Sequence, residues 1–282
     1  MENSEYHARP EVSASQLKIL KRSPLHFWDR FLNPDKPIVE PTPNMILGTL
    51  VHAAVLEPEQ FDKRYIVVPE GIDKRTKEGK QLLADLLATG REPVKHDVWQ
   101  DVSNMSQAVI RNAEVKKILD MSQKEVSLFW TDSDTGVLCK MRPDILIEPC
   151  DEYPNGAIFD LKTMADCSPE SFGKAVWNLE MLIQAGHYCN GCFNDNGFFP
   201  DFGWIAVETS RPHAVQMYSA SQLQIDYGRD ECSRLLRIYA ECSAVNNWPA
   251  YGDDVLELEL PGWAARIVDG EDDGSVEVSD AE

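Results

Sequence analysis

The sequence predicts an α/β fold in which a mixed central β-sheet is flanked by helices. Short apolar runs of strand length alternate with stretches of helical character, and no repeat of fixed period is present. The chain has 282 residues, of which 43% are hydrophobic, so it can bury a sizeable core. We therefore expect one domain with elaborations over residues 1–262 and an acidic tail over residues 263–282. The strand-like runs lie near residues 126–130, 137–148, 157–162 and 203–208.

The first two helices are placed by their N-terminal signals. Ser13 and Gln16 have the spacing of a capping box, which predicts a helix that continues through Arg22. Ser23 and Pro24 then provide an N-cap and a first-turn proline for a second helix.

Ser15, Lys18 and Arg22 belong to the first of these helices and are candidates for contact with a nucleic-acid backbone. Amides at a helix N-terminus are free to bind phosphate, and lysine and arginine add positive charge. Ordinary capping and a solvated basic face explain the same residues without any ligand. The sequence leaves both interpretations open.

The next element is an apolar run over residues 45–56 that contains His52. The run is too short to span a membrane, so we expect a buried helix. A histidine in such a helix is ordinarily a satisfied core residue, but neutral imidazole is also a competent metal ligand. His52 is therefore a candidate active-site residue.

Two carboxylates, Asp144 and Asp160, lie on apolar runs that we expect to form an antiparallel hairpin. The intervening residues 149–156 are rich in turn-forming types, which predicts a reversal of the chain. An unpaired carboxylate on a buried strand is costly unless it meets a metal ion or another cation. Carboxylate oxygens are also the ligands that hold hard divalent cations against a phosphodiester. The hairpin therefore predicts a metal-dependent nuclease centre.

Lys162 follows Asp160 by two residues, so both side chains share one face of the strand while Leu161 faces the other. A lysine in this position can orient or deprotonate a water molecule that attacks phosphate. A metal ion and burial would lower its pKa, whereas the carboxylates would raise it, and the sequence does not decide between them. The alternative is that this Asp-x-Lys pattern is a plain surface ion pair.

Further polar candidates flank the hairpin. Residues 168–193 begin with Ser-Pro-Glu and predict one long helix, on which Gln184 and Tyr188 share a face. Glu125 opens an apolar run and is either a further carboxylate near the metal or an ordinary strand-end charge. Arg142 precedes the first aspartate and can contact phosphate or pair with acids.

Five segments resemble, in matching order, the PD-(D/E)XK nuclease superfamily, and more closely its RecE-type exonucleases, the exodeoxyribonuclease VIII group of phages and prophages. Pro143-Asp144 is similar to the first acidic motif, and Asp160-Leu161-Lys162 to the second, with Asp where many relatives have Glu. The other three segments resemble the opening helices, the histidine motif and the Gln-x-x-x-Tyr helix. They comprise residues 13–28, 47–58 and 184–188. The resemblance implies a restriction-endonuclease-like core.

The resemblance also implies a cofactor and roles for the site residues. Lys162 would serve the attacking water, and Gln184 with Tyr188 would orient the substrate. Two Mg²⁺ ions, replaceable by Mn²⁺, would be held by His52, Asp144, Asp160, Glu125 and the backbone carbonyl of Leu161. A basic segment similar to one in the family would contact the DNA backbone, unless it is only an exposed loop and helix start. Its basic residues are Lys74, Arg75, Lys77 and Lys80.

The activity that the resemblance implies is a magnesium-dependent exonuclease acting on double-stranded DNA ends. It would degrade in the 5′-to-3′ direction and leave 3′ single-stranded overhangs for recombination with a strand-annealing partner. It would encircle DNA as a ring-shaped homo-oligomer, a trimer or tetramer. The alternatives are a DNA endonuclease or repair nuclease of the same superfamily, or a non-catalytic DNA-binding recombination module.

Charge is an objection to DNA binding, because a formal net charge of −20 should repel phosphates. Residues 251–282 contain 11 acidic residues and one arginine, a net charge of −10, so half of the excess lies there. From Gly270 onward we expect a disordered tail, which either shields the DNA channel or recruits a basic partner.

The cysteine content and the lack of targeting segments favour a reducing compartment. The chain has seven cysteines, no signal peptide and no apolar run of membrane length. We therefore expect free thiols and a cytoplasmic location in a bacterial host cell, with no membrane partner.

Overall fold

The computed structural model describes residues 1, 3–36, 39–73, 75–252 and 254–268. Its centre is a mixed sheet of five strands, which in spatial order are β3 (Gln123–Lys124), β6 (Ile145–Ile147), β7 (Ala157–Met164), β8 (Asp201–Glu208) and β9 (Val215–Ser219). β7 and β8 run parallel, and the other neighbours run antiparallel. The predicted α/β fold with a mixed central sheet is therefore confirmed.

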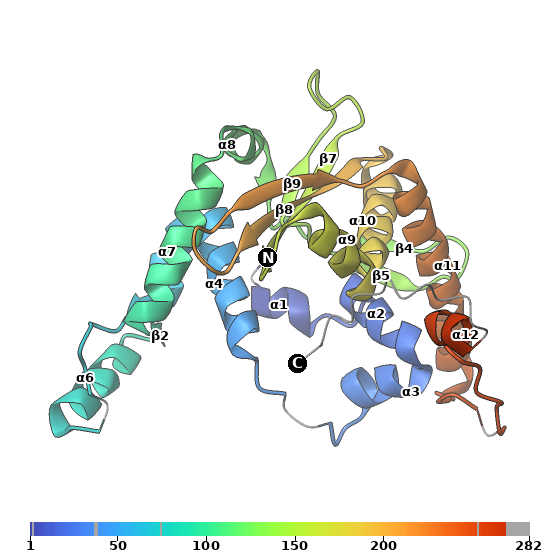
Figure 1. Cartoon of the computed structure of the whole chain (residues 1–282), viewed down its shortest axis with the longest axis horizontal. Helices are drawn as coiled ribbons and strands as arrows, with labels where there is room; N and C mark the ends of the chain where they lie inside the picture. The colour runs from blue at the N-terminus through green and yellow to red at the C-terminus, as the bar shows by residue number, and fades with distance from the viewer. Residues whose placement is uncertain (2, 37–38, 74, 253, 269–282) are drawn as a thin grey trace.

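Helices cover both faces of this sheet (Figure 1). One face packs against α4 (Pro43–Leu56), α7 (His96–Arg111) and α8 (Ala113–Met121). The other face packs against α2 (Ala14–Arg22), α9 (Pro169–Asn178), α10 (Met181–Asn196) and α11 (Gln222–Val245).

Side chains of β7 alternate between these two layers. Ala157 and Leu161 are buried in the cluster on the α4 side, and Ile158 is buried in the cluster on the α10 side. Because side chains alternate along a strand, Asp160 and Lys162 share the face of Ile158. The hairpin therefore places its carboxylate and lysine between the sheet and the α10 layer.

The N-terminal helices begin where the sequence predicts. The Ser13 N–H donates a 2.8 Å hydrogen bond to Gln16 Oε1 at the start of α2, as in a capping box. The Ser23 hydroxyl accepts a hydrogen bond from the His26 N–H at the start of the next helix. The remaining elements of this region are α1 (Asn3–Ala8), α3 (Pro24–Phe27) and the π-helical turn η1 (Trp28–Leu32).

A peripheral subassembly follows the buried helix α4. It contains α5 (Pro58–Arg64), β1 (Tyr65–Val67), α6 (Lys77–Ala88) and β2 (Glu92–Val94), and β1 pairs with β2 in parallel. Figure 1 shows α6 at the lower left, at the edge of the molecule.

The apolar run at 137–148 is two strands, not one. β5 (Leu138–Met141) pairs with β4 (Leu128–Thr131) in a separate two-stranded sheet, whereas β6 joins the central sheet. Pro143 lies at the break and has no N–H to donate to a ladder, which explains why pairing stops there. The acidic motif therefore sits where the chain passes between two sheets.

The single helix predicted over residues 168–193 is wrong, because the chain breaks between α9 and α10. Glu180 has a φ of 53°, in the left-handed region that ends regular helical geometry. α10 then packs closely on α11, where a Cβ on Gly228 would lie 2.0 Å from the Leu182 carbonyl oxygen.

The C-terminal part contains one further helix, α12 (Gly262–Val268), in the first part of the segment predicted to be a tail. Residues 269–282, which carry most of that predicted tail, lie outside the described residues. Among the described residues, no helix has the length and apolar character that crossing a membrane requires. All seven cysteines are free thiols and six of them are buried.

Candidate active site

The hairpin of β6 and β7 brings Asp144 and Asp160 into neighbouring positions. Ile145 pairs with Phe159 in the antiparallel register, and the two aspartates are the next pair along. Asp144 is held in place because its Oδ2 accepts a 2.8 Å hydrogen bond from the Leu161 N–H. The predicted role of the Leu161 carbonyl as a metal ligand stays a prediction.

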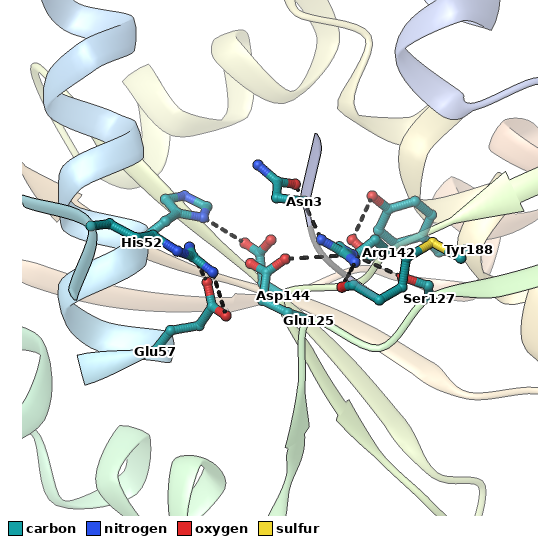
Figure 2. A network of polar contacts seen from close by, with 10 residues as sticks. Asn3, His52, Glu57, Glu125, Ser127, Arg142, Asp144 and Tyr188 are labelled. Carbon is teal, nitrogen blue, oxygen red and sulfur yellow. Dashed lines mark hydrogen bonds and ion pairs between the residues drawn. The ribbon is translucent and has the colours of Figure 1, made fainter. Parts of the chain in front are cut away.

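Asp144 forms a compact group with Glu125 and His52 (Figure 2). One ligand atom from each residue lies within 4.8 Å of the others. His52 comes from α4, and its Nδ1 lies 3.4 Å from Asp144 Oδ2. Glu125 follows β3 with a φ of 53°, and its N–H donates a 3.3 Å hydrogen bond to the Asp144 carbonyl. Three distant parts of the chain thus meet at one point.

Electrostatics at this group favour a cation. Burial, and then the neighbouring Asp144 carboxylate, raise the pKa of Glu125 to about 7. Burial also raises the pKa of Asp144, and the Asp160 carboxylate raises it further, whereas His52 opposes the rise. The two carboxylates supply oxygen donors that suit a hard divalent ion, and the imidazole adds a nitrogen donor of the kind that transition metals prefer. These residues therefore fit a metal, which would offset the repulsion between the acids.

Asp160 is engaged differently from the group of Glu125, Asp144 and His52. It is 1% exposed, its Oδ2 forms an ion pair with Lys162 Nζ, and its Oδ1 accepts a 2.6 Å hydrogen bond from Gln184 Nε2. Burial lowers the pKa of Lys162, but the Asp160 and Asp144 carboxylates more than offset this and raise it above its ordinary value. In this arrangement Lys162 is protonated, and the lowering of its pKa by a bound metal ion stays a prediction.

Tyr188 lies four residues after Gln184 on α10, as the predicted shared helix face requires. Its hydroxyl donates a 3.2 Å hydrogen bond to the Arg142 carbonyl (Figure 2). Burial raises the pKa of Tyr188 well above its usual range, so the hydroxyl stays neutral.

The Arg142 side chain is occupied by the N-terminal segment and is 8% exposed. Its Nη2 donates a 2.7 Å hydrogen bond to the Met1 carbonyl, and its Nη1 donates a 3.1 Å bond to Asn3 Oδ1. Its Nε donates a 2.9 Å bond to Ser127 Oγ (Figure 2). Direct contact between Arg142 and DNA, which the sequence suggests, would require this segment to move.

A cavity of about 520 Å³ is lined by His52, Glu125, Arg142, Gln184 and Tyr188 among these residues. Lys18 and Ser15 of α2 line it together with Gln184. Burial, and then the nearby Lys162 ammonium, lower the pKa of Lys18 to about 8. The lining therefore combines the carboxylate of Glu125 and the imidazole of His52 with the amine of Lys18.

The other residues predicted to contact DNA lie away from the cavity lining. Arg22 is exposed at the end of α2, and Lys77 and Lys80 are exposed in the first turn of α6. Arg75 forms an ion pair with Asp73, and Lys74 lies outside the described residues. A role for these side chains in DNA binding stays a prediction.

The structure adds cavity residues that the sequence did not single out. Glu57 and Arg64 line the cavity and pair with each other, with Arg64 Nη1 2.7 Å from Glu57 Oε2. Tyr6 and Asn3 of α1, close to the N-terminus, line it as well. Glu57 follows the candidate His52 by five residues, which is only a weak sequence signal that Glu57 belongs to the site. Nothing in the sequence indicates that α1 lies beside Arg142.

Comparisons with known proteins agree with this fold. A profile of the PDDEXK-like domain of unknown function (DUF3799) matches residues 13–257. The crystal structure of a candidate exonuclease from Eubacterium rectale is similar with a TM-score of 0.61 and 13% identity, over 98% of this chain and 99% of that one. An alkaline exonuclease from Laribacter hongkongensis gives a TM-score of 0.28 and 11% identity, over 67% and 97% of the two chains.

Among curated proteins no match was found. At 13% identity the Eubacterium rectale structure supports the fold alone, and the Laribacter hongkongensis structure adds no weight. The match over residues 13–257 covers most of the 282 residues. The chain therefore belongs to the PDDEXK-like family DUF3799.

Proposed function

We propose that this chain is a metal-dependent nuclease that degrades double-stranded DNA from its ends. The observation that carries the proposal is the group of Glu125, Asp144 and His52 beside the Asp160–Lys162 pair. A phosphodiester is anionic, so its hydrolysis requires charge neutralisation and an oriented water molecule. The candidate metal ligands His52 and Glu125 line one cavity together with Gln184, which holds Asp160 of the Asp160–Lys162 pair.

We assign the cation to His52, Glu125 and Asp144, where a bound Mg²⁺ would supply a Lewis acid and a more acidic water. Lys162 holds a proton at Nζ, so it can donate a hydrogen bond to the attacking water or to a phosphate oxygen. Asp160 keeps free lone pairs beside its contacts with Lys162 and Gln184, so it can serve as a further metal ligand.

Gln184 and Tyr188 keep the reacting groups in place. The Gln184 amide fixes Asp160, and Asp160 in turn holds Lys162. The Tyr188 hydroxyl fixes the backbone of Arg142, two residues before Asp144. Both contacts limit the freedom of the groups that act on the phosphate.

The finer properties rest on the resemblance to RecE-type exonucleases. We infer that Mg²⁺ is the working ion, that Mn²⁺ can replace it, and that two ions bind per site. We further infer degradation in the 5′-to-3′ direction with 3′ overhangs, a ring-shaped trimer or tetramer, and a single-strand annealing partner.

The test uses purified full-length protein with linear duplex DNA and with covalently closed circular DNA of the same sequence. With Mg²⁺ we expect loss of the linear DNA only, and with EDTA no loss of either. Asp144→Asn and Lys162→Ala should each lower the rate by about 100-fold or more. Lys174→Ala, an exposed lysine of α9, is the matched control and should retain the rate.

The possible results separate the alternatives. Nicking of the closed circle would favour an endonuclease of the same superfamily. No metal-dependent turnover, or variants as fast as the wild type, would refute the catalytic proposal and leave a DNA-binding module. Duplexes labelled at the 5′ or the 3′ end then report which strand is lost first.

A further inference from the structure

A second cavity, of about 490 Å³, lies between α7 and the β8–β9 connection. It shares no lining residue with the cavity at the candidate active site. Its polar lining comes from Asn104, Gln107 and Arg111 on α7 and from Arg211 and His213 on the connection. We name it the arginine pocket.

His213, one of the residues that line this pocket, has an unsatisfied polar atom. The residue is 7% exposed, and its Nδ1 lies 3.1 Å from the Glu208 carbonyl oxygen. A carbonyl only accepts, so Nδ1 carries the proton of the neutral ring. Nε2 is buried and has no hydrogen-bond partner among the described residues. Buried polar atoms without a partner are rare, and a ligand at the site would account for this one.

The two arginines bring uncompensated positive charge to the same place. Arg111 Nη2 donates a 3.1 Å hydrogen bond to the neutral Gln107 side chain. Among the described residues, neither Arg111 nor Arg211 lies within ion-pair distance of a carboxylate. In a chain of net charge −20, two exposed arginines without a carboxylate partner that line one pocket are unexpected. Arg111 lies in the last turn of α7, where a positive side chain interacts favourably with the negative end of the helix dipole. That interaction accounts for Arg111, but not for Arg211 or His213.

We propose that the arginine pocket binds a phosphate group. The guanidinium groups of Arg111 and Arg211 donate paired hydrogen bonds to phosphate oxygens, for which their planar geometry is suited. The side-chain amide of Asn104 adds a neutral donor. When the ligand binds, the His213 ring turns so that its buried Nε2 accepts a hydrogen bond from a protonated phosphate oxygen.

Two kinds of ligand carry a phosphate group that would fit this pocket. It is either part of a DNA backbone or a free phosphorylated anion. His213 lies on the connection that follows β8. Because β8 runs parallel to β7, this connection leaves the sheet at the same edge at which β7 ends, shortly after Lys162. A duplex that enters the active-site cavity could therefore reach the pocket, and a soluble anion could do so without DNA.

Arginine modification tests the proposal on the full-length protein. Phenylglyoxal labelling is followed by peptide mass spectrometry in EDTA, which prevents any metal-dependent cleavage. The additions are pyrophosphate in one arm and a duplex oligonucleotide in the other. We expect labelling of Arg111 and Arg211 to fall by about tenfold in at least one arm. Arg237, an exposed arginine of α11, serves as the internal control.

The arms distinguish the sources and can overturn the proposal. Protection by pyrophosphate assigns a free anion, and protection by the duplex alone assigns a backbone phosphate. If neither addition protects Arg111 and Arg211 more than Arg237, the pocket is not a phosphate site. This result is independent of nuclease activity, because no cleavage is measured.

Two variants provide a second measurement by calorimetry with the ligand that protects. His213→Asn removes the imidazole but keeps a residue that tolerates the φ of 59° found there. We expect His213→Asn and Arg211→Ala each to weaken binding by about tenfold, and Arg237→Ala to leave it unchanged. Unchanged affinity in both pocket variants would overturn the assignment.

Discussion

Gln184 positions the Asp160–Lys162 pair without being a candidate metal ligand itself. Its amide reaches Asp160 from α10, on the layer that covers this face of the sheet. Without that bond, Asp160 Oδ1 would be buried and unsatisfied, and the carboxylate could rotate. Lys162 would then lose a fixed partner.

We expect Gln184→Ala to lower kcat by roughly 10- to 100-fold while KM for duplex DNA changes little, because the side chain orients a neighbouring group. Steady-state cleavage of linear DNA in Mg²⁺ measures both constants. Gln81→Ala, which removes an exposed glutamine of α6, should change neither. A selective rise in KM would instead mean that Gln184 binds substrate directly.

Glu125 links protein stability to pH when no metal is bound. Its folded pKa of about 7 lies above its ordinary value of 4.5. Between pH 4.5 and pH 7 the folded state therefore holds a proton on Glu125 that the unfolded chain has already lost. The contribution of Glu125 to the free energy of unfolding is full below pH 4.5 and is lost as pH rises through 7. The loss amounts to at most about 3 kcal/mol.

In EDTA we expect the wild-type Tm to fall between pH 5.5 and pH 8, and Glu125→Gln to fall less. Mg²⁺ should raise the wild-type Tm at pH 8, because binding to the folded state alone stabilises it. Thermal melts at both pH values with and without Mg²⁺ measure these effects. If the Tm of the wild type and the Tm of Glu125→Gln depend equally on pH, Glu125 does not cause the fall in stability.

The sequence predicted which residue types meet at the site but not how they pair. Strand alternation and the turn-rich segment were enough to place Asp144, Asp160 and Lys162 together. Whether Lys162 is protonated depends on its distance from two carboxylates, which only the folded structure provides. Occupation of Arg142 by the N-terminal segment depends on contacts more than 130 residues apart in sequence.

Among the elements, strands and helix starts with local signals were predictable and breaks were not. The caps at Ser13 and Ser23 act within three residues, so the sequence displays them directly. The left-handed Glu180 breaks a helix without a glycine or proline, and β9 lies in a segment with no continuous apolar run. Both are set by packing against neighbouring elements, which overrides local preference.

Close packing of α10 on α11 fixes the helix that carries Gln184 and Tyr188. A Cβ on Gly228 would lie 2.0 Å from the Leu182 carbonyl oxygen and 2.8 Å from its carbon, so the backbones would have to separate. Gly173 in α9 provides the matched control, because no atom lies within 4 Å of its added Cβ.

We expect Gly228→Ala to lower the free energy of unfolding by about 1–3 kcal/mol, as overpacking does. It should also lower DNA cleavage, since α10 carries two site residues. Gly173→Ala should leave stability equal or raise it by up to about 1 kcal/mol, because alanine favours a helix. Urea unfolding of the metal-free proteins measures both. Equal stability of the two variants would contradict the close approach.

Across the whole molecule, the basic residues proposed to contact phosphate lie in two places, the active-site cavity and α6. The cavity at the active site combines Lys18 with the acidic group, and α6 presents exposed Lys77 and Lys80 at the periphery. DNA binding by such a chain depends on local contacts, because long-range attraction is absent at a net charge of −20. Assembly into a ring would place several such surfaces around one duplex.

The salt dependence of DNA binding tests whether α6 belongs to that surface. Each phosphate contact contributes about 0.9 to the slope of log K against log salt on duplex DNA. If Lys77 and Lys80 each contact a phosphate, the double variant Lys77→Ala/Lys80→Ala should bind more weakly and reduce the slope by about 2. Fluorescence anisotropy in EDTA, with a labelled duplex at several salt concentrations, measures this.

The control is Lys116→Ala/Lys174→Ala, which removes two exposed lysines that are each paired with an acid four residues away. Both double variants lower the net charge by the same amount, so any general electrostatic effect is equal in the two. A reduced slope only in the α6 variant therefore reports phosphate contacts at α6. Equal slopes would mean that α6 is an exposed helix outside the DNA path, and that the phosphate contacts lie nearer the active-site cavity.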